Sequence, residues 1–180
     1  MEPKDVDRRS TILLASDGQL RSNNRVLARI EKGEEGSFAR VIVEEAKYEV
    51  IRGKRSGWGF VLVRLLNRDV MCEFSPFHIR RGGRLRWGSS AIGLRSDIFR
   101  PRRWYFTVEG RRSVSVDVGA VRGGTRAGTE NIEMRLCVEQ TIQMVPEILS
   151  IIAFGCWLIV QWEATSMTMS SGPPILLENL

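Results

Sequence analysis

The side chains best suited to nucleophilic chemistry are scarce in this chain. His78 is the single histidine, and Cys72 is the cysteine that lies nearest to it in the sequence. A cysteine and a histidine can together form an activated nucleophile, but Pro76 separates these two. We therefore expect a buried cysteine on a strand and an exposed histidine in a loop, and we predict that the chain is not an enzyme.

Metal and cofactor sites are equally weakly indicated. A structural zinc site takes four Cys or His ligands, usually in closely spaced pairs. The chain has four such side chains, and none of them are paired in the sequence: Cys72, His78, Cys137 and Cys156. Cys156 also lies inside an apolar segment. The glycines at 57–59 and 123–124 lack the strand–helix context of a dinucleotide or phosphate loop. The sequence predicts no metal and no cofactor.

Positive charge is concentrated in the middle of the chain. The whole chain carries 27 Lys and Arg against 21 Asp and Glu, but residues 80–126 alone hold 12 basic and 3 acidic residues, a formal charge of +9. Residues 127–180 carry −5 by the same count. Nine arginines of the basic block are our candidate ligand-binding residues: Arg80, Arg81, Arg84, Arg86, Arg100, Arg102, Arg103, Arg111 and Arg112.

Such a block has two interpretations. Arginines at alternating positions are the ordinary solvent-facing half of a half-buried sheet. They can also attract anionic partners, and we name anionic phospholipid headgroups or phosphorylated ligands first and nucleic acid second. Stacking of bases on Trp104 is disfavoured, because Trp104 shares an apolar strand face with Phe106 and Val108 and is expected in the core. No protein partner is indicated.

Short strands account for most of the chain before residue 140. Period-two alternation is clearest at 84–87, 104–109 and 113–118, where Ser113, Ser115 and Asp117 are expected on the wet face. Frequent turns rich in glycine, with strands at intervals of about 8–12 residues, are typical of a sandwich or barrel. The expected strands are 11–15, 25–30, 38–43, 47–51, 58–66, 69–74, 84–87, 104–109, 113–118 and 131–138.

The period changes near the C-terminus. Pro146 and Glu147 suit the first turn of a helix, and Ile148–Trp162 contains no charged residue. A helix that is apolar on every face must be buried in protein or in lipid. The run is short for a bilayer, acidic residues flank it, and no basic residue does, so we favour protein. A closed sheet could enclose it. The alternative is a membrane protein with a hydrophobic anchor at 145–162.

Four segments carry a resemblance to a known group: Lys47–Ile51, Trp104–Val108, Ser113–Asp117 and Val145–Trp162. Over residues 11–163 the chain resembles the LURP-one-related branch of the tubby C-terminal-like superfamily. The resemblance implies an antiparallel barrel around one hydrophobic C-terminal helix and no catalytic residue set. Tubby members of the group bind phosphoinositides through basic surface residues.

Together these observations predict a mainly β (α+β) protein with one antiparallel β-barrel. We expect an N-terminal lead (1–10), a barrel domain (11–163) with central helix 146–162, and a C-terminal tail (164–180). The predicted function is non-enzymatic binding or scaffolding, with the arginine-rich face on an anionic lipid or phosphorylated ligand. With an odd cysteine count and no signal peptide, we expect an intracellular, cytoplasmic protein that is peripheral at a membrane, or membrane-anchored in the alternative.

Overall fold

In the part of the chain that it describes, the computed structural model has twelve strands and one helix. It describes residues 11–15, 17–23, 25–53, 59–77, 81–100, 102–108, 111–120, 132–138 and 146–168. The strands are β1 (Thr11–Leu14), β2 (Gln19–Ser22), β3 (Arg25–Lys32), β4 (Ala39–Val43), β5 (Ala46–Arg52), β6 (Phe60–Arg64), β7 (Val70–Pro76), β8 (Gly82–Trp87), β9 (Ser90–Ser96), β10 (Arg103–Val108), β11 (Arg111–Ala120) and β12 (Ile132–Val138). The helix is α1 (Pro146–Thr168).

All twelve strands form one closed antiparallel barrel in chain order. Consecutive strands are neighbours throughout, and β1 closes the ring by pairing with β12, Ile12 opposite Leu136. The pairing of β1 with β2 is the shortest, with only Leu13 and Leu14 in register with β2. This closure confirms the predicted barrel and leaves no exposed sheet edge among these strands.

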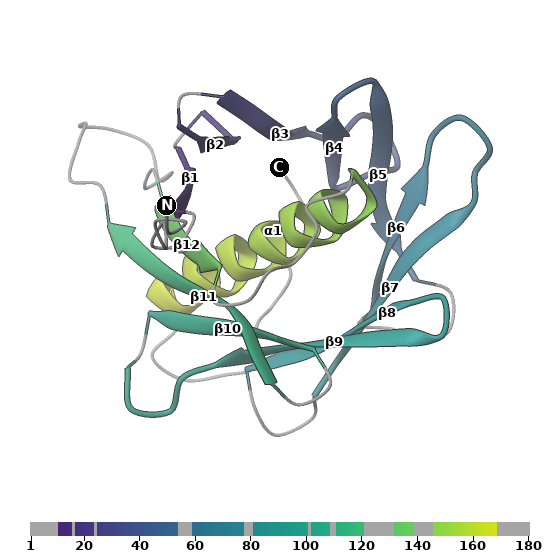
Figure 1. Ribbon diagram of the computed structural model, residues 1–180. Helices are drawn as coiled ribbons and strands as arrows, with labels where there is room; N and C mark the ends of the chain where they lie inside the picture. Colours follow the sequence, from purple (N-terminus) through teal and green to yellow (C-terminus); the bar gives the residue numbers. More distant parts are fainter. Residues whose placement is uncertain are drawn as a thin grey trace, which may run out of the picture.

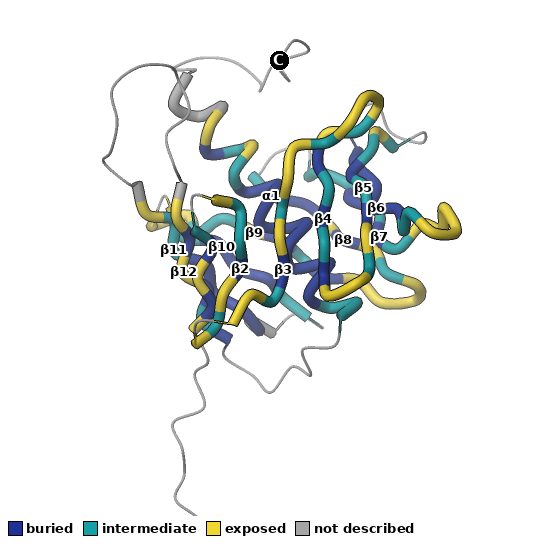
Figure 2. The backbone as a smooth tube through the Cα atoms, turned by 90° about the horizontal axis from the view of Figure 1, so that it is seen from above, coloured by how far each residue is buried: buried dark blue, intermediate teal, exposed yellow. Residues whose placement is uncertain are grey.

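Helix α1 runs through the interior of the barrel (Figure 1). Its central residues are buried on every side, and the dark-blue segments of Figure 2 continue from α1 into the surrounding strands. At Gly155 the helix backbone lies against β10, because an added Cβ would lie 2.3 Å from the Phe106 ring. The predicted buried helix is therefore confirmed, and the barrel supplies the enclosing surface that its apolar sides require.

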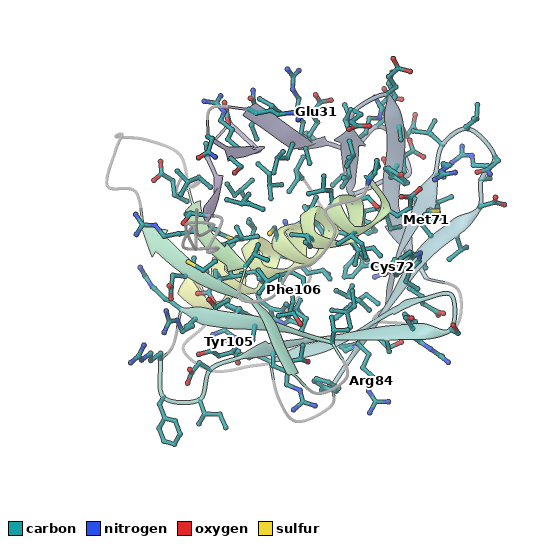
Figure 3. All side chains as sticks on the ribbon, viewed as in Figure 1. Glu31, Met71, Cys72, Arg84, Tyr105 and Phe106 are labelled. Carbon is teal, nitrogen blue, oxygen red and sulfur yellow. The ribbon has the colours of Figure 1, made fainter. Side chains whose placement is uncertain are left out.

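The strands alternate between the helix and the solvent. Trp104 and Phe106 of β10 and Leu85 of β8 are buried, whereas Arg84 and Arg86 are exposed. Figure 3 shows Phe106 turned toward α1 and Arg84 extending away from the helix on the outside of the sheet. The placement of Trp104 in the core agrees with the prediction from its strand face.

Three features differ from the sequence-based expectations. Strands β2 and β9 were not predicted, and α1 continues beyond Trp162 to Thr168. The expectation that Ser113 and Ser115 face water is wrong, because both are buried. Ser115 lies directly opposite Tyr105 in the β10–β11 ladder, and the Tyr105 side chain is itself buried on the outer face. A large ring beside a small hydroxyl therefore removes this part of the outer surface from solvent.

Candidate anion-binding surface

The nine predicted arginines do not form one set, because two of them are held within the fold. Arg103 of β10 makes a bidentate ion pair with Asp117 of β11, with Nε–Oδ1 at 2.6 Å and Nη2–Oδ2 at 2.9 Å. The two residues are direct partners in the strand ladder. The hydrogen bond to Asp117 raises the pKa of Arg103 above its usual value. Such a parallel two-bond geometry is the strongest that guanidinium makes, so Arg103 is a structural residue here.

Arg81 lies at the end of the barrel beside the C-terminal part of α1. Its Nη2 donates to Oε1 of Glu163 at 2.9 Å, and Trp104 Nε1 donates to the same oxygen at 3.0 Å. The Arg81 guanidinium also lies 5.3 Å from the centre of the Trp104 ring, which stacks on Trp162 with ring centres 5.4 Å apart. Glu163 is only 5% exposed, so these donors offset the cost of burying its charge.

In the sequence, Glu163 is recognisable only as the acidic residue that bounds the apolar run. The structure gives it a definite role, because it satisfies the buried indole N–H of Trp104 and pairs with Arg81. A signal for this was present in the sequence: an enclosed helix that carries a carboxylate directly after Trp162 needs a cationic partner from the surrounding strands.

Three exposed arginines lie on the outer face of neighbouring strands β8 and β9. Arg84 and Arg86 belong to β8, and Arg95 belongs to β9. In the ladders Arg84 lies opposite Ser75 of β7 and Gly93 of β9, so both of its cross-strand neighbours are uncharged. Arg95 was missed because β9 was not recognised as a strand. Its guanidinium lies 5.7 Å from the centre of the Phe77 ring.

Two further exposed arginines, Arg100 and Arg102, lie in the β9–β10 turn. The turn follows Ser96, the last residue of β9, and returns to the barrel at Arg103. The backbone N–H groups of Arg102 and Arg103 both donate to the carbonyl of Arg100, at 3.1 and 2.9 Å. The turn therefore places two cations at the end of the same pair of strands that carries Arg84 and Arg95.

We call the set Arg84, Arg86, Arg95, Arg100 and Arg102 the arginine surface. Within the part of the chain that the structure describes, none of the five makes an ion pair. The one carboxylate across the ladder is Glu73, opposite Arg86. Five guanidinium groups on adjoining elements without acidic partners can receive phosphate or carboxylate oxygens from outside the chain.

The other predicted arginines cannot be assigned to this surface. Arg80 lies outside the described residues. Arg111 and Arg112 are described by their backbone alone, in β11 opposite Val108 and Thr107 of β10. His78, the candidate partner of Cys72, also lies outside the described residues.

The described residues give no arrangement for nucleophilic or metal chemistry. Cys72 is buried on β7 inside the barrel, as predicted, and burial raises the pKa of its thiol to about 12. Burial likewise raises the pKa of Cys156 on α1 to about 12. Both thiols are therefore protonated and poorly nucleophilic at neutral pH. Among the described residues, no three His, Cys, Asp or Glu side chains gather closely enough to hold a metal ion.

Two hollows lie elsewhere on the barrel, each with a volume of about 380 Å³. One lies over β1, β11 and β12 and is lined by Asp117, Glu133 and Arg135 among others. The second lies over β3 and β4, beside Arg29 and Glu44. Both mix charges of the two signs, and neither is lined by a residue of the arginine surface.

Comparison of the chain with protein-family models, with curated proteins and with solved structures gave no match.

Proposed function

We propose that this chain is a non-enzymatic, intracellular binding protein that docks peripherally on anionic phospholipid surfaces through its arginine surface. The observation that carries the proposal is the cluster of five exposed arginines without an ion pair in the described part of the chain. Guanidinium groups bind phosphate oxygens through two parallel hydrogen bonds, and lipid headgroups present many such oxygens in a plane.

The arrangement of the elements suits a flat partner. β8, β9 and the β9–β10 turn adjoin one another on the outside of the barrel, on the lower side of the molecule in Figure 1. An arginine close to an anionic membrane contributes about 1 kcal/mol, so five would contribute about 5 kcal/mol. That is weak, reversible docking with a dissociation constant somewhat below about 1 mM.

The resemblance to the tubby-like group adds a second line of support. The closed barrel around a hydrophobic helix is the fold that the resemblance implies. We include membership of the LURP-one-related branch in the proposal.

The alternative of a membrane anchor at 145–162 is less well supported. Residues 146–164 of α1 are long and apolar enough to span a membrane by length and composition, but 67% of that stretch is buried inside the barrel. Insertion would require α1 to leave the barrel and expose the inner faces of the strands to water, at about 25 cal/mol for each Å² of apolar surface. The peripheral interpretation keeps this core intact. It predicts that the full chain is soluble without detergent and that removal of 145–180 makes it insoluble.

Vesicle co-sedimentation tests the proposal. We expect the full chain to pellet with phosphatidylcholine vesicles that contain phosphatidylserine and to stay in the supernatant with phosphatidylcholine alone. Binding should fall steeply between about 0.05 M and about 0.5 M NaCl, because salt screens surface charges. Equal binding to neutral vesicles, or binding that salt leaves unchanged, would contradict the proposal. If inositol hexakisphosphate binds the chain but anionic vesicles do not, the ligand is a soluble phosphate compound.

A further inference from the structure

The β9–β10 turn carries two large apolar side chains in full contact with solvent. Ile98 is 73% exposed and Phe99 is 91% exposed, and they are consecutive in the sequence. Single exposed apolar residues are common on protein surfaces, but an adjacent pair at the tip of a protruding turn leaves apolar area in water that a partner could cover.

This exposure results from a well-organised turn. The Asp97 carboxylate accepts hydrogen bonds from the backbone N–H groups of Phe99 at 2.8 Å and Arg100 at 3.2 Å. The second carboxylate oxygen accepts a hydrogen bond from the Tyr105 hydroxyl at 2.8 Å. The backbone N–H of Asp97 donates to the carbonyl of Arg103 at 2.7 Å. One side chain therefore holds the turn against the buried ring of Tyr105. The hydrogen bonds of Asp97 therefore hold Ile98 and Phe99 in their exposed position.

Cations border the apolar tip along the chain on both sides. Arg95 precedes the turn on β9, and Arg100 and Arg102 follow Phe99 within the turn. The three make no ion pair with any residue that the structure describes. An apolar tip with flanking arginines matches the layering of an anionic bilayer, where phosphates lie above the acyl chains and arginine heads remain at the phosphate level.

We propose that Ile98 and Phe99 insert into the acyl boundary of an anionic bilayer while Arg95, Arg100 and Arg102 bind the headgroups around them. The inference rests on the proposed function and assigns the residues that enter the membrane. Electrostatic attraction alone gives marginal binding, and stable membrane association usually combines charge with a second, apolar contribution. The β9–β10 turn supplies both.

Other occupants fit this tip less well. A second copy of the chain would bring the same arginines face to face without acidic partners from the surface itself. A nucleic acid would find the charges suitable, but Ile98 is aliphatic and offers no ring on which a base could stack. A lipid acyl boundary accepts both the isoleucine and the phenylalanine.

The β6–β7 turn provides a matched internal control. Leu66 there is 93% exposed, as fully as Phe99. The arginines beside it are engaged: Arg68 pairs with Glu49 at 2.9 Å, and Arg64 lies 3.6 Å from Glu147. An equally exposed apolar side chain without free cations should therefore stay in water when the protein docks.

The experiment compares the full-length variants Phe99→Trp and Leu66→Trp on phosphatidylcholine/phosphatidylserine vesicles. The fluorescence emission of the wild-type protein is subtracted from that of each variant. A parallel set of vesicles contains lipids with brominated acyl chains, which quench a tryptophan that inserts among them. We expect a blue shift and bromine quenching for Phe99→Trp and neither for Leu66→Trp. The double variant Ile98→Ser/Phe99→Ser should bind the same vesicles about ten to a hundred times more weakly, because it loses the apolar contact and keeps the arginines.

The failures of the two proposals are distinguishable. If Phe99→Trp binds the vesicles in a salt-dependent manner without shift or quenching, insertion is wrong and headgroup binding stands. If Leu66→Trp is quenched as strongly as Phe99→Trp, the assignment to the β9–β10 turn is wrong. If no variant binds vesicles, both proposals fall. If a single-stranded RNA oligonucleotide changes the Phe99→Trp emission and vesicles do not, the lipid proposal is wrong and the partner of the turn is a nucleic acid.

Discussion

The exposed arginines on two sides of the barrel differ in whether they form ion pairs. On the β4–β7 side, Arg40 pairs with Glu34 at 2.8 Å and lies 3.6 Å from Glu49, which also pairs with Arg68. On the β8–β10 side, the five arginines of the arginine surface have no ion pair within the described residues. Both sides also present an exposed apolar turn.

The comparison shows that exposed apolar surface does not distinguish the two sides. The β6–β7 turn exposes Leu66, the adjoining start of β7 exposes Val70, and the β9–β10 turn exposes Ile98 and Phe99. Among the described residues, the turns differ in their ion pairs: carboxylates pair with the arginines beside the β6–β7 turn, and none pairs with the members of the arginine surface beside the β9–β10 turn. Function is therefore expected where apolar area and unneutralised cations coincide.

The largest effect on stability is expected when a buried carboxylate that pairs with an arginine is removed. Glu163→Ala removes the acceptor of both Arg81 and the buried Trp104 indole. We expect the free energy of unfolding to fall by about 2–3 kcal/mol, measured by chemical denaturation, because a buried donor loses its acceptor and Arg81 loses its counter-charge. Vesicle binding by the folded protein should not weaken, since Glu163 is buried, carries a negative charge and makes no ion pair with the arginine surface.

Glu163→Gln is the matched control for this variant. It keeps an acceptor for Trp104 and removes only the charge, so the loss should be about 1 kcal/mol. Equal losses for the alanine and glutamine variants would show that the indole hydrogen bond contributes nothing measurable.

A small effect is expected on the neutralised side. Arg68→Gln removes an exposed arginine from its pair with Glu49. Such surface pairs contribute about 0–1 kcal/mol, so unfolding should change by less than about 1 kcal/mol and vesicle affinity by less than twofold. A loss of vesicle affinity as large as that of an arginine-surface variant would remove the distinction between the two sides.

Much of the fold could be predicted from the sequence because the spacing of apolar residues clearly distinguishes strands from the helix. The apolar run after Pro146 and the alternation in 84–87 and 104–109 correspond to α1, β8 and β10. β2 is short and polar, and the inner face of β9 is marked only by Ile92 and Leu94 on either side of Gly93, so both strands give a weak pattern and are held by their neighbours in the ladders. The helix end was placed too early because Glu163 reads as a stop unless its buried partners are known.

The candidate site was predicted only in outline. The sequence shows where arginines are dense, but it does not show which of them find a carboxylate across a strand. Arg103 and Asp117 lie far apart in the sequence and are neighbours in the ladder, which removes Arg103 from the candidates. The ladder also adds a residue to the surface: Arg95 of β9 lies opposite Gly82 of β8, which brings it beside the arginines of that strand.

We infer that docking depends on the position of positive charge and not on its amount. The most direct measurement is the vesicle partition coefficient of Arg84→Glu/Arg95→Glu against that of Arg25→Glu/Arg29→Glu. Arg25 and Arg29 are exposed on β3, across the barrel from β8 and β9 (Figure 1), and both variants change the net charge equally. We predict a loss of about thirtyfold or more for the first variant, at about 1 kcal/mol or more for each reversed arginine, and less than threefold for the second. Equal losses would contradict the claim.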